Sequence, residues 1–439
     1  MKGTELKGKR LLILGGNLWK KAIKEFADEN GIVLVATGNN QTAGIFEIAD
    51  ETYGVNSTDA VAIKKLIAEA KIDGVYLGGS EAVISAACQY VNELGMPCYC
   101  THEQWEYLQN KSNFKELCIC NGLPVVPRYS VENEVSNAVP LEEYPVITKP
   151  TDGCGSSGFS VCHNPDELKK GYEIATKESP TGSVIIEKFV PNDGVVVFYT
   201  VSEGRLIFSG LEDKYPVRYE KQGSYVGGLF TFESDLADTF RALFEERIEK
   251  MIRSIGIKEG SFWIEVFHHK DEFYFNEVGF RYGGSASIYP VDYKHGINQV
   301  AADIYYALTG KSKTSGFTSL IPEKLPRKKY YAVYPIYCQE GNIQKVIGTD
   351  EAASMNNMVT FPVIHSVGSH IADTGSFSQV VALAHFVYDT EKELKETIEE
   401  VHKKVKFIGE NNENMVIRML KLDELRLKNV MKKGVNREI

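Results

Sequence analysis

Two glutamates inside apolar strands are the most informative residues of this sequence. Glu265 and Glu277 lie in GSFWIEVFHHKDEFYFNEVGFRYGG, on either side of the polar stretch from His269 to Glu272. Such a stretch between aromatic and β-branched runs predicts a β-hairpin. With its turn centred on Asp271, the two carboxylates face each other, with Cβ atoms about 4.5–5.5 Å apart. An unpaired buried charge is costly, so the pair predicts bound Mg²⁺ or Mn²⁺. The alternative is an exposed sheet face on which both glutamates meet only water.

A glycine-rich segment after Lys149, TKPTDGCGSSG, is the second chemical signal. Its backbone N–H groups are suited to holding phosphate. A Walker loop is excluded, because the lysine precedes the glycines and the apolar run FSVCH, typical of a strand, follows them. A phosphate-covering hairpin is therefore predicted, with a plain β-turn as the alternative. The residues predicted to contact phosphate here are Gly153, Gly155, Ser156, Ser157 and Gly158.

These groups together indicate a binding site for a nucleoside triphosphate. Lys111 and Lys149 supply positive charge, the two glutamates supply metal ligands, and Arg281 follows the second glutamate. Transfer of the γ-phosphate of ATP depends mainly on positioning and on neutralising charge. The sequence therefore predicts an ATP and Mg²⁺ site.

The elements that must position these groups begin with an alternating N-terminal region. The apolar runs RLLILGG, IVLVAT, DGVYLGG and PCYC alternate with amphipathic helical segments, which predicts βαβ units and a parallel sheet. Ligands gather beyond the carboxyl ends of such strands, where Gly15–Gly16 and Gly78–Ser80 lie. A dinucleotide site is not supported, because GGNLWKK departs from G-x-G-x-x-G and no acidic residue follows Thr37.

Composition bounds the remaining possibilities. The 439 residues carry a net charge of −10, which argues against a nucleic-acid-binding protein. No apolar run approaches the ~18 residues of a membrane span, so a cytoplasmic protein is expected. The eight cysteines are spread out and favour reduced thiols rather than a disulfide framework. After residue 120, strands are expected to dominate to about residue 232, and a mixed α+β lobe follows from about residue 323.

The sequence resembles the ATP-grasp superfamily, in particular its carboxylate–amine ligases for amino acids and dipeptides. The segments that carry the likeness are NKSNFKELCICNGLPVVP, YPVITKP with its loop, VIIEKFV and IEVF…FNEVGFRYGG. The resemblance implies a multidomain α/β and α+β protein with a Rossmann-like domain at 1–105, an ATP-grasp domain at 106–322 with a lid at about 130–184, and a C-terminal lobe at 323–439. It also implies these site residues: Lys111 and Lys149 on the ATP phosphates; Glu187, Lys188, Val190 and Asp193 around adenine and ribose; Glu265 and Glu277 on two Mg²⁺ ions; and Arg281 on an acyl phosphate.

By the same resemblance, a small-molecule carboxylate is activated as an acylphosphate and joined to an amine, and a homodimer is possible. The segment LEDKYPVRYEK is expected to be a loop facing the substrate. The substrate candidates are Asp213, Lys214, Arg218, Gly283, Gly284 and Ser285. Two alternatives stay open: a carboxylase that activates bicarbonate, and a nucleotide-binding protein without turnover.

One position departs from the family pattern. Relatives place an asparagine two residues after the second metal ligand, where this chain has Gly279. On a regular strand Asn276 would point to the opposite face from Glu277, so it could not replace the missing asparagine ligand. The expectation is therefore a vacant ligand position filled by water, and a weakly held second metal. The alternative is that substrate or backbone approaches Gly279 closely.

Overall fold

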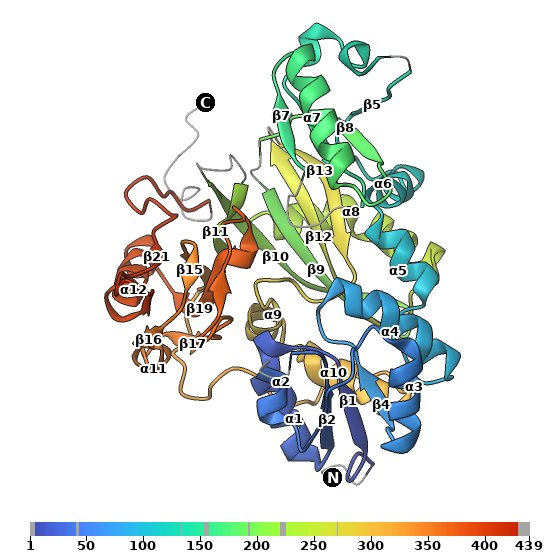
Figure 1. The fold of residues 1–439 in the computed structure, drawn as a ribbon, viewed down its shortest axis with the longest axis vertical. Helices are drawn as coiled ribbons and strands as arrows, with labels where there is room; N and C mark the ends of the chain where they lie inside the picture. The colour runs from blue at the N-terminus through green and yellow to red at the C-terminus, as the bar shows by residue number, and fades with distance from the viewer. Residues whose placement is uncertain are drawn as a thin grey trace.

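The computed structural model describes residues 5–40, 44–132, 134–152, 158–191, 194–219, 225–269 and 271–428. Figure 1 shows an N-terminal α/β region in blue, a small teal sheet at the opposite end, and a long central sheet between them. The orange and red C-terminal elements lie beside the central sheet. Among the described residues, no helix combines the length and apolar character needed to cross a membrane.

The N-terminal region has the predicted alternation of parallel strands and helices. Its four-stranded sheet has the order β3-β2-β1-β4, and every neighbouring pair is parallel. The side chain of Asp59 caps α3 by accepting hydrogen bonds from the backbone N–H groups of Val61 and Ala62. The strand expected at residues 97–100 is not formed. The elements are β1 (Arg10–Ile13), η1 (Asn17–Trp19), α1 (Lys20–Asn30), β2 (Val33–Thr37), α2 (Gly44–Ile48), β3 (Glu51–Tyr53), α3 (Ala60–Glu69), β4 (Gly74–Tyr76), α4 (Glu81–Glu93) and α5 (His102–Gln109).

Two glycine turns meet at the carboxyl ends of β1 and β4. A Cβ on Gly78 would lie 2.6 Å from Gly15 Cα, and Gly78 has a φ of +75°. Only glycine tolerates both the contact and the dihedral angle. This close approach leaves the ends of the two strands open to the adjacent cavity.

The teal sheet is antiparallel, with the order β5-β8-β6-β7. Helix α7 packs against β6 and β7, in a stretch where strands are expected to dominate. Asn164 caps α7 and a proline occupies its first turn, which is a helix-start signal readable in the sequence. The elements are α6 (Lys111–Cys120), β5 (Arg128–Tyr129), η2 (Val135–Asn137), η3 (Leu141–Glu143), β6 (Val146–Pro150), β7 (Ser160–Cys162), α7 (Pro165–Glu178) and β8 (Val184–Lys188).

The central sheet continues into the C-terminal part of the chain. Its path is β13-β12-β9-β10-β11-β14-β19-β17, and β21 pairs with β14. Helix α8 buries Phe240, Phe244 and Ile248 in the core shared with β12 and β13. The elements are β9 (Gly194–Ser202), β10 (Arg205–Arg218), β11 (Tyr225–Phe232), α8 (Ala237–Ser254), β12 (Gly260–His269), β13 (Glu272–Gly279), α9 (Ile288–His295), α10 (Gln299–Thr309), β14 (Tyr330–Cys338), β17 (Met358–Thr360), β19 (Val380–Tyr388) and β21 (Val416–Ile417).

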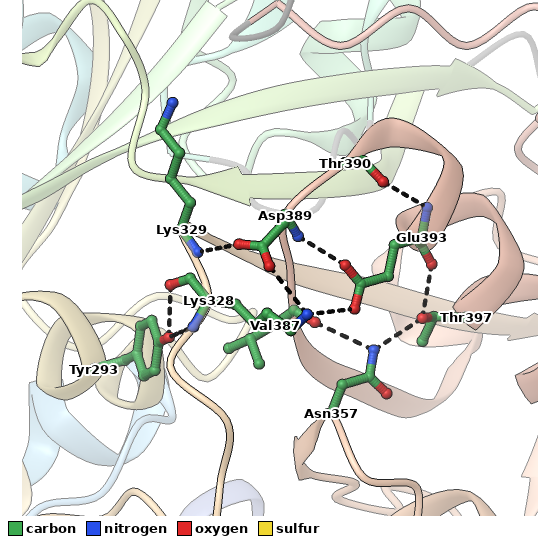
Figure 2. A network of polar contacts seen from close by, with 9 residues as sticks. All are labelled: Tyr293, Lys328, Lys329, Asn357, Val387, Asp389, Thr390, Glu393 and Thr397. Atoms are coloured by element: carbon green, nitrogen blue, oxygen red, sulfur yellow. Dashed lines mark hydrogen bonds and ion pairs between the residues drawn. The ribbon is translucent and has the colours of Figure 1, made fainter.

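Polar contacts hold the connection between α10 and β14 in place (Figure 2). Lys328 Nζ lies 3.0 Å from Asp389 and 3.2 Å from Glu393, while Tyr293 on α9 donates a hydrogen bond to the Lys328 carbonyl. These contacts join α9 to the end of β19 and the start of α12. The remaining elements are β15 (Gly341–Asn342), β16 (Lys345–Ile347), α11 (Thr349–Ala353), β18 (His370–Ile371), η4 (Phe377–Gln379), α12 (Glu391–Lys404) and β20 (Lys406–Ile408). Residues 341–348 thus contribute two short strands to different sheets.

Candidate active site

The hairpin β12–β13 brings the two glutamates together as predicted. Glu265 is directly opposite Glu277 in the antiparallel ladder. The turn is tighter than expected, because His269 already pairs with Glu272. The register shifts by one residue between Glu265 and Val266, and this β-bulge restores the predicted pairing.

The bulge overturns the expected orientation of Asn276. Because the ladder passes from Val266–Phe275 to Glu265–Glu277, Asn276 is the extra residue on β13. Its Nδ2 donates to Glu265 Oε2 at 2.6 Å, and its Oδ1 accepts from Lys149 Nζ at 3.0 Å. The prediction that Asn276 points away from the glutamates is therefore wrong, since alternation fails at a bulge.

The water-filled vacancy expected at Gly279 is also wrong. A Cβ built on Gly279 would lie 2.3 Å from Cε2 of Trp263, so the indole already fills this space. The Arg281 guanidinium lies 5.5 Å from the centre of the same ring. Gly279 therefore makes room for Trp263, which packs beside Arg281.

A buried ion-pair cluster supports Lys149. The Glu187 carboxylate is fully buried, pairs with Lys115, and lies 2.9 Å from Lys149 Nζ. Burial alone would raise the pKa of Glu187, but the two lysines outweigh it and leave that pKa below its usual value. Burial lowers the pKa of Lys115 to about 8, and the adjacent Lys149 charge acts in the same direction. The cluster fixes Lys149 at the base of the glycine-rich segment.

Two further lysines complete the positive surroundings of the carboxylates. Lys111 begins α6, and its Nζ lies 3.9 Å from Glu277 Oε2. Lys214 Nζ lies 2.5 Å from Glu265 Oε1. Together with Lys149, three cations surround a pair of facing carboxylates.

The donor set fits a hard cation. Glu265, Glu277 and Asn276 present oxygen atoms on one face, and oxygen is the ligand that Mg²⁺ prefers. No cluster of three or more His, Cys, Asp or Glu side chains able to hold a metal occurs within the described part of the chain. Mg²⁺ therefore fits as an ion held by two carboxylates and shared with phosphate oxygens, as is usual for nucleotide sites.

Arg281 lies where two openings meet. Its Nη2 donates to Glu81 at 2.6 Å, and its Nε is buried with no hydrogen-bond partner among the described residues. A cleft of about 760 Å³ runs from Arg281 past Glu277 and Lys111. A second cavity of about 380 Å³ extends from Arg281 over the glycine turns of β1 and β4. Arg281 is therefore positioned to contact ligands in both spaces.

The predicted substrate loop is part of a strand. Asp213, Lys214 and Arg218 lie on β10. Asp213 is buried and accepts a hydrogen bond from Ser234 at 2.8 Å, whereas Lys214 reaches the carboxylate site. The loop prediction is wrong for residues 211–218, because β10 pairs with β9 up to Lys214 and with β11 up to Arg218. Arg218 lies at its exposed end.

Some of the other predicted residues lie in the described structure, and the rest lie outside it. Gly283 and Gly284 line the smaller cavity, and Ser285 is buried next to them. Lys188 binds Glu143 at 2.9 Å. Gly158 has a φ of +71° and packs against Pro150, and Val190 follows β8. The predicted positions Gly153, Gly155, Ser156, Ser157 and Asp193 lie outside the described residues.

Sequence reasoning missed three contacts of this site, made by Lys115, Asn276 and Trp263, whereas Glu81 ends the segment Gly78–Glu81 that was expected to line the substrate site. Lys115 lies one helical turn after Lys111, which is a signal that both side chains share a helix face. Trp263 is two residues before Glu265 on the same strand, so a shared face was readable there as well. Asn276 gave no such signal, because a bulge positions it.

Comparisons with known proteins agree with this geometry. Residues 120–285 match the family model described as an ATP-grasp domain. A formate-dependent phosphoribosylglycinamide formyltransferase from Cronobacter sakazakii is 24% identical over 286 residues, covering 63% of this chain and 71% of the relative.

Two solved structures share the fold across most of the chain. An L-amino acid ligase from Bacillus licheniformis has a TM-score of 0.71 at 18% identity, covering 92% of this chain and all of the ligase chain. The biotin carboxylase domain of Hydrogenobacter thermophilus 2-oxoglutarate carboxylase, solved with MgADP, has a TM-score of 0.73 at 19% identity and covers 91% of each chain. Residues 120–285, which include the facing glutamates, therefore form an ATP-grasp domain within this chain.

Proposed function

We propose that this protein is an ATP-dependent ligase that activates a small-molecule carboxylate as an acylphosphate and joins it to an amine. The observation that carries the proposal is one continuous polar site. A chain of side-chain contacts runs from Glu187 through Lys149 and Asn276 to Glu265. Glu277 faces Glu265 across the hairpin. ATP and Mg²⁺ are its cofactors. Two Mg²⁺ ions, replaceable by Mn²⁺, are part of the proposal.

In the first step, a carboxylate oxygen of the substrate attacks the γ-phosphorus of ATP, and the bond to the ADP oxygen breaks. Lys111 and Lys149 hold the phosphate oxygens, because both lysines border the carboxylate pair. Glu265 and Glu277 hold Mg²⁺, which supplies charge neutralisation and a template for the phosphates. In the second step the amine nitrogen attacks the acyl carbon, phosphate leaves, and the nitrogen gives up a proton to water.

Arg281 is assigned to the acyl phosphate. Its Nε is buried without a hydrogen-bond partner among the described residues, and an oxyanion would satisfy it. Glu81 and the Trp263 ring hold the guanidinium from two sides. Closure of the predicted lid at about 130–184 would exclude water, which protects an acylphosphate from hydrolysis.

The smaller cavity supports an unphosphorylated second substrate with an apolar body. Trp19, Phe46 and Ile45 line it, and Arg281 is the sole charged side chain among the described lining residues. The single guanidinium balances one carboxylate, whereas a phosphate monoester carries about −1.5 to −2 charges at pH 7. The Cronobacter relative is named for phosphoribosylglycinamide, and this cavity supports a different acceptor.

A screen of ADP release tests the proposal. Amino acids and small carboxylic acids would be supplied singly and in pairs, with bicarbonate alone as the competing reaction. Release that needs both an acid and an amine supports the ligase; release with bicarbonate alone supports the carboxylase. No release under any condition, with ATP still bound, indicates a nucleotide-binding protein without turnover. A cytoplasmic homodimer completes the proposal, and light scattering tests the dimer.

A further inference from the structure

A cationic groove lies between the end of β10 and the C-terminal segment 417–428. Its volume is about 760 Å³, within the range of small-molecule sites. Glu424 is the single acidic residue among its described lining. The cations that line it are Lys214, Arg218, Arg418, Lys421, Arg426 and Lys428. With six cationic residues and one carboxylate in its lining, the groove is positively charged, although the net charge of the chain is −10.

The groove has a fixed framework. Strand β21 pairs with β14, and Leu425 and Leu427 are buried in the C-terminal core. The backbone N–H of Lys428 donates to Tyr215 Oη at 2.9 Å, and Lys428 Nζ donates to the Lys214 carbonyl at 3.0 Å. The C-terminal segment is thus tied directly to the strand that forms the opposite wall.

Part of the positive charge is not balanced by the protein. Arg418 pairs with Glu399 at 2.8 Å, and Lys421 lies 3.5 Å from Glu424. In the described part of the chain, Arg218 and Arg426 form no ion pair, and Arg426 donates to backbone carbonyls instead. Guanidinium groups bind carboxylates and phosphates with two parallel hydrogen bonds. Mutual repulsion of such cations is relieved when an anion binds.

Lys214 connects this groove to the catalytic carboxylates. Its backbone lies on the groove wall, and its Nζ contacts Glu265. An anion in the groove is therefore one side chain away from the predicted metal site. We infer that the groove binds the anionic end of the carboxylate substrate, which then carries at least one carboxylate or phosphate besides the carboxylate that is activated. That the groove binds anions is independent of the proposed function, whereas the role of the groove in substrate binding rests on the proposed ligase function.

Direct binding tests the site. Citrate and inorganic pyrophosphate would be titrated into the full chain by calorimetry, without Mg²⁺ and at constant ionic strength. The double variant Arg218→Gln/Arg426→Gln should weaken the binding of the preferred anion at least about tenfold, since two charge-assisted contacts are lost. Arg253→Gln is the matched control, because Arg253 is 60% exposed on the distant helix α8. Lys149→Met is the second control and reports on the predicted ATP phosphate site.

Unchanged affinity in the double variant, or loss of affinity only in Lys149→Met, overturns the groove site. Preference for citrate identifies a polycarboxylate, and preference for pyrophosphate identifies a phosphorylated acid; both support the site. ADP release then tests the role. The double variant should raise the KM for a polyanionic acid about tenfold and leave that for a monocarboxylic acid unchanged. If the wild type and the double variant turn over with equal KM values for the polyanionic acid, the substrate-binding role is wrong and the ligase proposal stands. If the double variant weakens anion binding but neither protein releases ADP, the groove site stands and the ligase proposal is wrong.

Discussion

Asn276 donates a 2.6 Å hydrogen bond to Glu265, although a regular hairpin would place these two residues on opposite faces. The bulge thereby places a side-chain amide beside the predicted metal ligand Glu265. The same amide accepts from Lys149, so it links the predicted metal ligand to the predicted phosphate-binding lysine. Lys149, 127 residues before Asn276, is thereby joined to the β12–β13 hairpin.

Replacing Asn276 with alanine tests this arrangement. Asn276→Ala leaves Lys149 and Glu265 without their shared partner, which costs about 1–3 kcal/mol and predicts a 10- to 100-fold lower kcat. The Mg²⁺ concentration for half-maximal rate should rise. Asn342→Ala is the control, since the Asn342 amide binds Glu410 away from the site. Equal kcat and Mg²⁺ dependence in both variants would contradict the role of Asn276.

Gly279 and Trp263 give a second test. In Gly279→Ala the new methyl group collides with the indole, and overpacking of this kind destabilises by about 1–3 kcal/mol. Urea unfolding followed by tryptophan fluorescence measures the loss. Gly284→Ala is the comparison for stability, because its added Cβ would meet nothing within 4 Å. A Gly279→Ala protein as stable as Gly284→Ala would show that Trp263 moves aside without cost.

Lys115 and Lys149 contact the same carboxylate, but replacing Lys115 should lower stability whereas replacing Lys149 should change the kinetics. Lys115→Met leaves a fully buried Glu187 with one cation fewer, and breaking a buried ion pair typically costs about 3–5 kcal/mol. Lys149→Met should mainly raise the KM for ATP and lower kcat. Melting temperature and kinetics measured on both variants separate the two effects. The reverse pattern would exchange the structural and phosphate-binding roles.

Glu265 and Glu277 should act as a single metal unit. Glu265→Ala and Glu277→Ala should each nearly abolish turnover, and the double variant should lose little more, because groups that act together are non-additive. ATP binding measured by calorimetry without Mg²⁺ should persist in all three proteins. Additive losses in kcat would indicate that the two carboxylates do not share their metal.

Stability should fall in mild acid because of His385. This side chain is fully buried on β19 beside Tyr331, and burial lowers its pKa to about 3. An unfolded histidine titrates near 6.5, so between these values only the unfolded state binds the proton. The free energy of unfolding should therefore decrease by about 1.4 kcal/mol for each pH unit below about 6.5. Urea unfolding at pH 7.5 and pH 5.0 measures this loss, and His385→Gln should reduce it. An identical pH dependence in His385→Gln would assign the effect to other groups, such as half-buried His402.

Much of this protein follows from local sequence signals. Alternating apolar runs and helix caps such as Asp59 determine the parallel N-terminal sheet, because each element needs only its own periodicity and termini. The apolar hairpin with its polar turn likewise predicts two paired strands around Glu265 and Glu277, although their direct pairing depends on the bulge. The lysine before the glycine-rich segment was identified for the same reason, since residue types at short spacing carry the chemistry.

Tertiary structure decided the features that depend on a partner distant in sequence. The bulge that turns Asn276 toward Glu265 depends on the register of two paired strands, and strand periodicity cannot show a register shift. Pairing of β11 with β14 joined the central and C-terminal parts in one sheet. The groove cations come from β10 and from residues 417–428, about two hundred residues apart, and they meet because Lys428 is held against Tyr215 and Lys214. Composition reports only a net acidic chain, since the local sign of charge depends on which surfaces the fold brings together.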